Sequence, residues 1–294
     1  MSEQKRAINN IWIFFGITLG ATWLLWIPGI LQTFLFPNIP EILILVLTIV
    51  ATFVPSIMGF VSVGIESGKS GMRDLLKRGV QFKGCKWCLT SVLLFPILIT
   101  LVHAINFGVR GIPIPLTDMV RNEPWKIPFA FLMGMFTGGP IGEEFGWRGY
   151  ALPQLQKKYG GWMSALTVGV IGGVWHLPAF FIDGIPQRTM PIGLFLVTDL
   201  LFTFIIAFLQ NISKGSLVPA ILLHTLMNLT METMPLVTET GDGSAWWIAN
   251  IMLGIICIFL LIFTRPKDFS SRFSLQPTPI HQGLDHISYK ESSD

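Results

Sequence analysis

Two adjacent carboxylates and an arginine interrupt a strongly apolar part of the sequence. Glu143, Glu144 and Arg148 lie in the segment GPIGEEFGWRGY (139–150), and the preceding residues 127–142 carry no charge. Ionisable groups at membrane depth are costly and are usually kept for function. Side chains four residues apart share a helix face, so Glu144 and Arg148 can pair, whereas Glu143 is rotated by roughly 100°. An unpaired carboxylate in a poorly solvated site resists ionisation and can carry a proton near neutral pH, so we expect Glu143 to be the reactive acid.

Three further polar residues stand in later apolar runs. His176 lies in VIGGVWHLPAFF, and His224 and Asn228 lie four residues apart in AILLHTLMNLT, so these two share a helix face. A helix rises about 1.5 Å per residue, which places Glu143 and His176 at a similar depth and His224 nearer the membrane surface. Neutral imidazole and the Asn amide can both donate hydrogen bonds, so these residues and a proton-carrying carboxylate are groups with which acid–base chemistry could be done.

The composition indicates what kind of protein carries these residues. Of 294 residues, 51% are hydrophobic and 13% are charged, and the mean hydropathy is +0.62. Such a chain is too apolar for an ordinary soluble domain, so we expect an all-α, polytopic membrane helix bundle. The net charge of +3 comes from bases scattered among apolar runs, which favours contact with anionic lipid and argues against nucleic acid. Three cysteines cannot form a disulfide framework.

The apolar runs predict about eight membrane-spanning helices, because a span needs roughly 20 apolar residues. The first run is too long for the core of a signal peptide, so we expect a retained helix. The predicted spans are 7–40, 42–65, 87–109, 127–142 continuing to about Lys158, 159–182, 189–213, 215–231 and 243–264.

The distribution of basic residues predicts the orientation. Only four of the 20 lysines and arginines fall in loops that would lie outside if the N-terminus is inside, so both termini are predicted to be cytoplasmic, in a cell membrane. The basic loop 66–86 is interpreted as a topology signal with a lipid-facing surface. We therefore divide the chain into N-terminal helices with this loop (1–126), a core (127–232), a last span (233–264) and a flexible polar tail (265–294).

Glycines on the fourth predicted helix indicate close packing. Gly134, Gly138, Gly142 and Gly146 repeat every four residues, which predicts a smooth stripe where another helix can approach. Pro140 lies inside this stripe and is expected to kink the helix near the carboxylates.

The three motifs together resemble a known family. EExxxR at 143–148, a histidine at 176 and HxxxN at 224–228 resemble the CAAX protease and bacteriocin-processing family of intramembrane glutamic endopeptidases, which includes type II CAAX prenyl endopeptidases. The resemblance covers about 127–232. It departs from the family at Gly172, where an aromatic residue is usual four positions before the histidine.

The resemblance implies a fold, an activity and a role for each residue. The core would be a conical four-helix unit without a cofactor, and the substrate a peptide or membrane protein, lipidated in some members. Glu143, helped by His176, would activate water, while His224 and Asn228 would stabilise the oxyanion. The remaining two motif residues would support the site: Glu144 and Arg148.

Other interpretations remain open at this stage. A metal held by Glu143, His176 and His224 is a minority alternative, because zinc accepts carboxylate and imidazole. The chain has no HExxH, and Asp199 is the only aspartate inside a span, so neither a zincin nor an aspartyl dyad is expected. A non-catalytic membrane adaptor or immunity protein, or a proton-coupled carrier, would also use buried polar groups; the lack of an internal repeat counts against the carrier.

Several polar residues have no predicted chemistry. Cys85 and Cys88 form a lone CxxC, for which neither a zinc site nor a redox fold is indicated. His103, Asn106 and Asp199 are expected to form hydrogen bonds between helices.

Overall fold

A computed structural model describes residues 3–82, 86–137, 139–238 and 241–264, with side chains from residue 10 onward. The predicted polar tail and Cys85 lie outside the described residues. Within them the chain is a bundle of helices without a strand, so the all-α prediction is confirmed. The α-helices and π-helix are α1 (Glu3–Phe34), α2 (Glu41–Val80), α3 (Lys86–Arg110), α4 (Asp118–Asn122), α5 (Ile127–Thr137), α6 (Pro140–Glu144), the π-helix η2 (Phe145–Ala151), α7 (Leu152–His176), α8 (Ile192–Ile212), α9 (Val218–Thr233) and α10 (Ser244–Phe263). Short 3₁₀ turns are η1 (Pro124–Lys126), η3 (Leu177–Phe181) and η4 (Pro186–Thr189).

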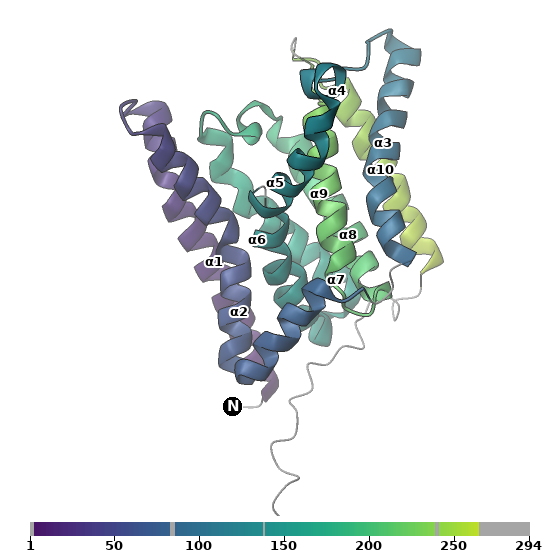
Figure 1. The fold of residues 1–294 in the computed structure, drawn as a ribbon. Helices are drawn as coiled ribbons and strands as arrows, with labels where there is room; N and C mark the ends of the chain where they lie inside the picture. Colours follow the sequence, from purple (N-terminus) through teal and green to yellow (C-terminus); the bar gives the residue numbers. More distant parts are fainter. Residues whose placement is uncertain (1–2, 83–85, 138, 239–240, 265–294) are drawn as a thin grey trace, which may run out of the picture.

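The helices pack as a splayed bundle around the segment α5 to α7. Helix α1 packs on α2, α7 on α8, α3 on α9, and α10 on both α3 and α8. The pair α1 and α2 and the pair α3 and α10 stand on opposite sides and diverge toward the end that carries the α1–α2 loop (Figure 1). This arrangement leaves α6, η2 and α9 in the middle of the molecule.

Six helices of the described part are long and apolar enough to cross a membrane. Together with α9, these six correspond to the eight predicted spans. The stretch Pro124–Phe181 contains two of the predicted spans, and the seventh corresponds to α9, whose 16 residues are shorter than a full crossing. The protein is therefore a polytopic membrane protein.

The prediction of one continuous helix from Ile127 to about Lys158 is wrong. Gly139 has φ +107°, which only glycine adopts readily, and it separates α5 from α6. Pro140 is then the first residue of α6, where its missing N–H costs nothing, so it begins a helix instead of kinking one. A second break occurs at Gly160, with φ +72°.

The predicted glycine stripe is correct in its second half. Cβ atoms at Gly142 and Gly146 would collide with the backbone of α2, at the carbonyl groups of Thr52 and Pro55 respectively. A Cβ at Gly134 would meet nothing within 4 Å, and Gly138 lies outside the described residues. The stripe therefore seats α6 and η2 directly on α2, while α5 does not take part.

Pro55 determines how α2 presents polar atoms to its neighbours. Because proline lacks an N–H, the carbonyl of Ala51 loses its partner inside the helix, and the hydroxyl of Thr22 on α1 lies 3.5 Å from it. The next residue, Ser56, donates to the carbonyl of Ile141 on α6 at 2.8 Å. Helix α2 thus bonds to α1 through a carbonyl that the proline frees, and to α6 through a serine hydroxyl.

The segment predicted as a basic loop is helical. Helix α2 bends at Gly68, with φ +61°, and continues as residues 69–80, here called the floor helix, which runs beneath α9 (Figure 1). Lys69, Arg73 and Lys77 are exposed on it, as a lipid-facing surface requires. Arg78 is not: it is 4% exposed and donates to the carbonyls of Gly149 and Gly215 at 2.9 and 2.8 Å. Interpreting every base here as surface charge was wrong for Arg78, because these carbonyls compensate its burial.

Interhelical hydrogen bonds were predicted for two polar residues of α3, and both are confirmed. Nε2 of His103 lies 3.4 Å from the carbonyl of Met234, and Ser244 donates to Oδ1 of Asn106 at 2.9 Å. These contacts join α3 to Met234, which directly follows α9, and to the first residue of α10.

Candidate active site

The two glutamates occupy the first turn of the helix that starts at Pro140. The backbone N–H of Glu143 donates to the carbonyl of Gly139 at 2.7 Å, and the side chain of Glu143 folds back so that a Cβ at Gly139 would strike its Oε1. Trp147 lies near the same carboxylate. Glu143 and Glu144 are 6% and 0% exposed, so both acids lie in the protein interior.

The predicted pairing of Glu144 with Arg148 is confirmed. Their Oε1 and NH1 atoms are 3.3 Å apart, although a π-helix begins between them. The same oxygen lies 2.8 Å from Nδ1 of His224, which comes from α9. Among the described residues Glu143 has no ion-pair partner, whereas Glu144 has two.

His224 is at the depth of the glutamates and not nearer the surface, so that prediction is wrong. The turn before α9 is drawn into the molecule, because the N–H of Leu217 donates to the carbonyl of Arg78 at 2.8 Å. The floor helix covers this turn, and α9 therefore begins well inside the bundle. The short distance from Val218 to His224 along α9 is then enough to reach Glu144.

His176 is the last residue of α7, and its tautomer is fixed by one contact. Nδ1 lies 2.8 Å from the carbonyl of Gly172, which can only accept, so Nδ1 carries the hydrogen and Nε2 is the acceptor. The ring lies edge-on to Phe195 of α8 and to Trp175, with centroid distances of 5.0 and 4.6 Å. A neutral imidazole with a basic Nε2 is suited to accept a proton or to orient a water molecule.

The predicted residues gather around one centre. Glu143 interacts electrostatically with His224 and Arg148, and His176 interacts with the same two residues. Asn228 follows His224 by one turn on α9 and is partly buried. The described contacts do not include a direct bond between Glu143 and His176.

Comparison with known proteins matches this geometry to a family. The sequence profile of the type II CAAX prenyl endopeptidase Rce1-like family matches residues 123–230, which contain every predicted site residue. The chain is also 24% identical over 238 residues to CAAX prenyl protease 2 of Methanococcus maripaludis, a match that covers 78% of this chain and 86% of the relative. Both comparisons support similarity of this chain to the CAAX protease family, over the segment that carries the three motifs. The names of the family and of the relative indicate a protease, and the helices place it in a membrane. A hydrolase has a use for polar side chains buried among membrane-spanning helices.

Two residues that support the site were missed by the sequence analysis. Thr203 accepts a hydrogen bond from NH2 of Arg148 at 3.1 Å, and Gln210 donates to the backbone carbonyl of Arg148. Both lie on α8, where Asp199, Thr203 and Gln210 are spaced by four and seven residues and so share one face. That polar stripe in an apolar helix was the signal that could have identified them.

Two buried polar atoms of the Glu144 and Arg148 pair have no hydrogen-bond partner among the described residues. They are Oε2 of Glu144 and Nε of Arg148. Over the same residues, no group of three or more His, Cys, Asp and Glu side chains is placed to hold a metal ion.

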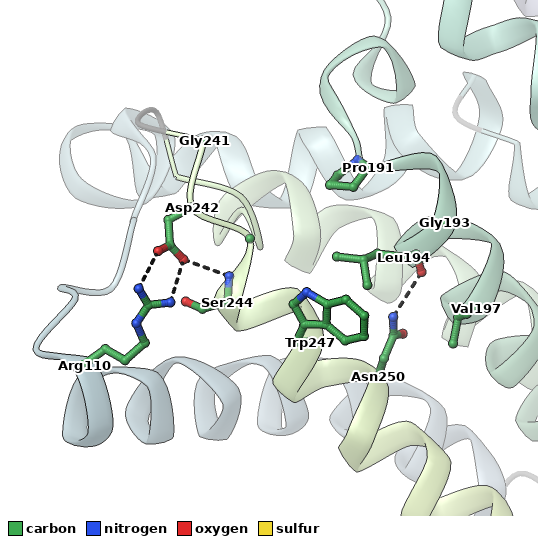
Figure 2. A pocket seen from close by; sticks show the side chains of 11 residues that line it. Arg110, Pro191, Gly193, Leu194, Val197, Gly241, Asp242, Ser244, Trp247 and Asn250 are labelled. Atoms are coloured by element: carbon green, nitrogen blue, oxygen red, sulfur yellow. Dashed lines mark hydrogen bonds and ion pairs between the residues drawn. The ribbon is translucent and has the colours of Figure 1, made fainter.

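A separate hollow, here called the outer hollow, lies away from these residues, between the first turns of α8 and α10 (Figure 2). Its volume is about 770 Å³, and Trp247, Leu194 and Val197 form much of its wall. Arg110 and Asp242 form an ion pair of 3.0 Å at its rim. The hollow contains none of the residues of the family motifs, so it is distinct from the candidate active site.

Proposed function

We propose that this protein is an intramembrane endopeptidase in which Glu143 activates a water molecule for attack on a peptide bond. The proposal extends the similarity to a protease family to a residue-level mechanism. Support comes from the placement of a buried carboxylate without an ion-pair partner beside two histidines and an arginine. The residues carried over from the family motifs are Glu143, Glu144, Arg148, His176, His224 and Asn228.

The observation that carries the mechanism is the oxygen that Glu144 shares between Arg148 and His224. A carboxylate only accepts hydrogen bonds, so Nδ1 of His224 must donate to Glu144. A neutral imidazole would then have no hydrogen on Nε2 and could not stabilise an oxyanion. His224 therefore serves as an imidazolium, which donates from both nitrogens and whose charge Glu144 balances.

In the proposed reaction Glu143 acts twice, first as the base and then as the acid. Glu143 accepts a proton from water, with Nε2 of His176 helping to orient that water, and the water oxygen bonds to the carbonyl carbon. Nε2–H of His224 and the amide of Asn228 donate to the oxyanion of the tetrahedral intermediate. Glu143 returns the proton to the amide nitrogen, the carbon–nitrogen bond breaks, and the products are an acid and an amine.

The substrate class follows from the family and from the surroundings of the site. We propose a peptide with a prenylated C-terminal segment, since the matching family and the archaeal relative are both named for prenyl endopeptidase activity. The site would be reached from the side of the floor helix, which the distribution of basic residues assigns to the cytoplasm. A lipid anchor would keep the substrate at the membrane while its peptide enters the bundle.

The test is cleavage of peptides by purified protein in lipid vesicles. Peptides ending in a CAAX sequence are offered with and without a farnesyl group, alongside a mixed peptide library, and the products are identified by mass spectrometry. Glu143→Gln is expected to lower the rate by about 10³-fold, the scale of removing a general base. Thr264→Val, a change at the end of α10, serves as a control with wild-type activity.

The outcomes separate the alternatives. Cleavage by the wild type, loss with Glu143→Gln and no effect of a chelator support the glutamate mechanism. Loss of cleavage with the chelator would support the metal alternative. If neither protein cleaves any peptide while both restore a deletion phenotype equally, the adaptor interpretation replaces the enzyme, and uptake of solute by vesicles would indicate a carrier.

A further inference from the structure

Asp199 lies against the helix that ends in His176, beside Gly172 and Gly173. A Cβ at Gly172 would lie 3.2 Å from Oδ2 of Asp199, and a Cβ at Gly173 would lie 3.8 Å from it. Gly172 is also the residue whose carbonyl holds Nδ1 of His176. The carboxyl of Asp199 is thus packed onto the turn of α7 that orients the catalytic histidine.

The carboxyl of Asp199 is poorly compensated there. Oδ2 is closed off from solvent and has no hydrogen-bond partner among the described residues. No described cation lies within ion-pair distance of it, because Arg148 is engaged with Glu144 and Thr203. The predicted interhelical hydrogen bond of this residue is therefore not found for Oδ2, and a buried carboxylate without a partner is costly.

The groups that surround Asp199 are those of the active site. It interacts electrostatically with Glu143 and Glu144 of α6, with Arg148 of η2 and with His224 of α9. His176 is the titratable residue of α7 nearest in sequence to the Gly172 turn. On α10, the thiol of Cys257 faces Leu201, on a different side of α8.

Among these groups the acids outnumber the permanent cations. Three carboxyls, those of Glu143, Glu144 and Asp199, share one permanent cation, Arg148. Glu144 takes both that cation and His224 through a single oxygen. Glu143 and Asp199 are left as two acids without a counter-ion in one poorly solvated volume, so ionisation of either one opposes ionisation of the other.

We propose that Asp199 is a third acid of the site, which shares protons with Glu143 and so sets the pH at which Glu143 can act as the base. In this proposal Asp199 acts through Glu143 and has no step of its own in the reaction; its Oδ2 is closed to solvent. This inference rests on the proposed role of Glu143. A role in helix packing alone would be met equally well by asparagine, which has the same shape, and would leave the pH dependence unchanged.

The test compares wild-type protein with Asp199→Asn over a range of pH. Removing the competing acid lets Glu143 lose its proton more easily, so the acid limb of kcat/KM is expected at a pH lower by about half a unit to one unit. Asp199→Glu keeps the charge and should retain the wild-type limb. Thr198→Val is the matched control, because Thr198 is a buried neighbour on α8 that bonds to Asn250 and Trp246 instead of facing the acids.

A second measurement does not depend on catalysis. Infrared titration of the protonated carboxyl band is made on wild-type protein, Asp199→Asn and Glu143→Gln. In each variant the remaining acid should lose its proton over a narrower and lower pH range than the pair does in the wild type. Independent titration of the two groups, or an acid limb that is unmoved in Asp199→Asn, overturns the proposal, as does a folded Asp199→Asn protein that is inactive at every pH. Coupled titration in a protein that cleaves nothing would refute the peptidase function alone.

Discussion

Oε1 of Glu144 lies 2.8 Å from Nδ1 of His224, although 80 positions separate the two residues in the chain. The same oxygen is 3.3 Å from NH1 of Arg148. A single buried oxygen therefore connects α9 to the π-helix that follows the glutamates. The charge of Glu144 determines both where His224 lies and whether its imidazole can be doubly protonated.

Glu144→Gln should remove the charge that balances the His224 imidazolium. The amide can still accept a hydrogen bond, so the fold is retained, but Nε2 of His224 loses its hydrogen at neutral pH. We expect kcat to fall by about 100-fold, the scale of losing one oxyanion donor, with KM little changed. Single-turnover cleavage measures this. Glu123→Gln is the control, since Glu123 forms an exposed pair with Lys126 at 2.6 Å; equal losses in the two variants would contradict the role.

Gly139→Ala should damage the site in two ways. The residue has φ +107°, where alanine is strained by roughly 1 kcal/mol, and the new Cβ would strike Oε1 of Glu143. We expect a loss of activity of at least about tenfold, because a base displaced by a fraction of an ångström is poorly aligned. Gly134→Ala on α5 is the control, since its Cβ meets nothing within 4 Å. Wild-type activity in Gly139→Ala would show that the carboxylate is not held here.

The contacts of the candidate site that form within one helix could be predicted from the sequence. The pairing of Glu144 with Arg148 followed from a spacing of four residues, and it survives in the π-helix because both side chains still face the same side. The depth of His224 could not be predicted, because it depends on the floor helix, whose Arg78 bonds to a turn 137 residues away. The break at Gly139 was also missed: glycine tolerates a positive φ but does not by itself indicate one.

Gly146→Ala should lower stability by about 2 kcal/mol or more, because the added methyl would collide with the carbonyl of Pro55 and backbone cannot rotate aside. The thermal midpoint in detergent is the measurement. Gly254→Ala on α10 makes the same chemical change where nothing lies within 4 Å, and it should be neutral or slightly stabilising. Similar midpoints for the two variants would argue against direct packing of η2 on α2.

The rim of the outer hollow should respond only to strongly acidic pH. Hydrogen bonds from the side chain and backbone of Ser244, and then the charge of Arg110, hold the pKa of Asp242 below its ordinary value. A lowered pKa means that the contact stabilises the fold above the ordinary pKa and is lost as the pH falls through the lowered value. Fluorescence of Trp247, at the same rim, should therefore be constant from neutral pH down to about pH 4 and change below it. Asp242→Asn should abolish that change; a transition near neutral pH would contradict this assignment.

The contacts of the floor helix also determine in which order parts of the candidate site can form as the chain is synthesised. Its partners Gly149 and Gly215 come 71 and 137 residues later in the chain than Arg78. While the ribosome makes the intervening helices, the apolar side of the floor helix has nothing to cover it. Lys69, Arg73 and Lys77 on its exposed side can hold it against anionic headgroups during that interval. The active site is thus closed last, when α9 arrives, so a chain interrupted before that point carries the glutamates but not the enclosure that makes them reactive.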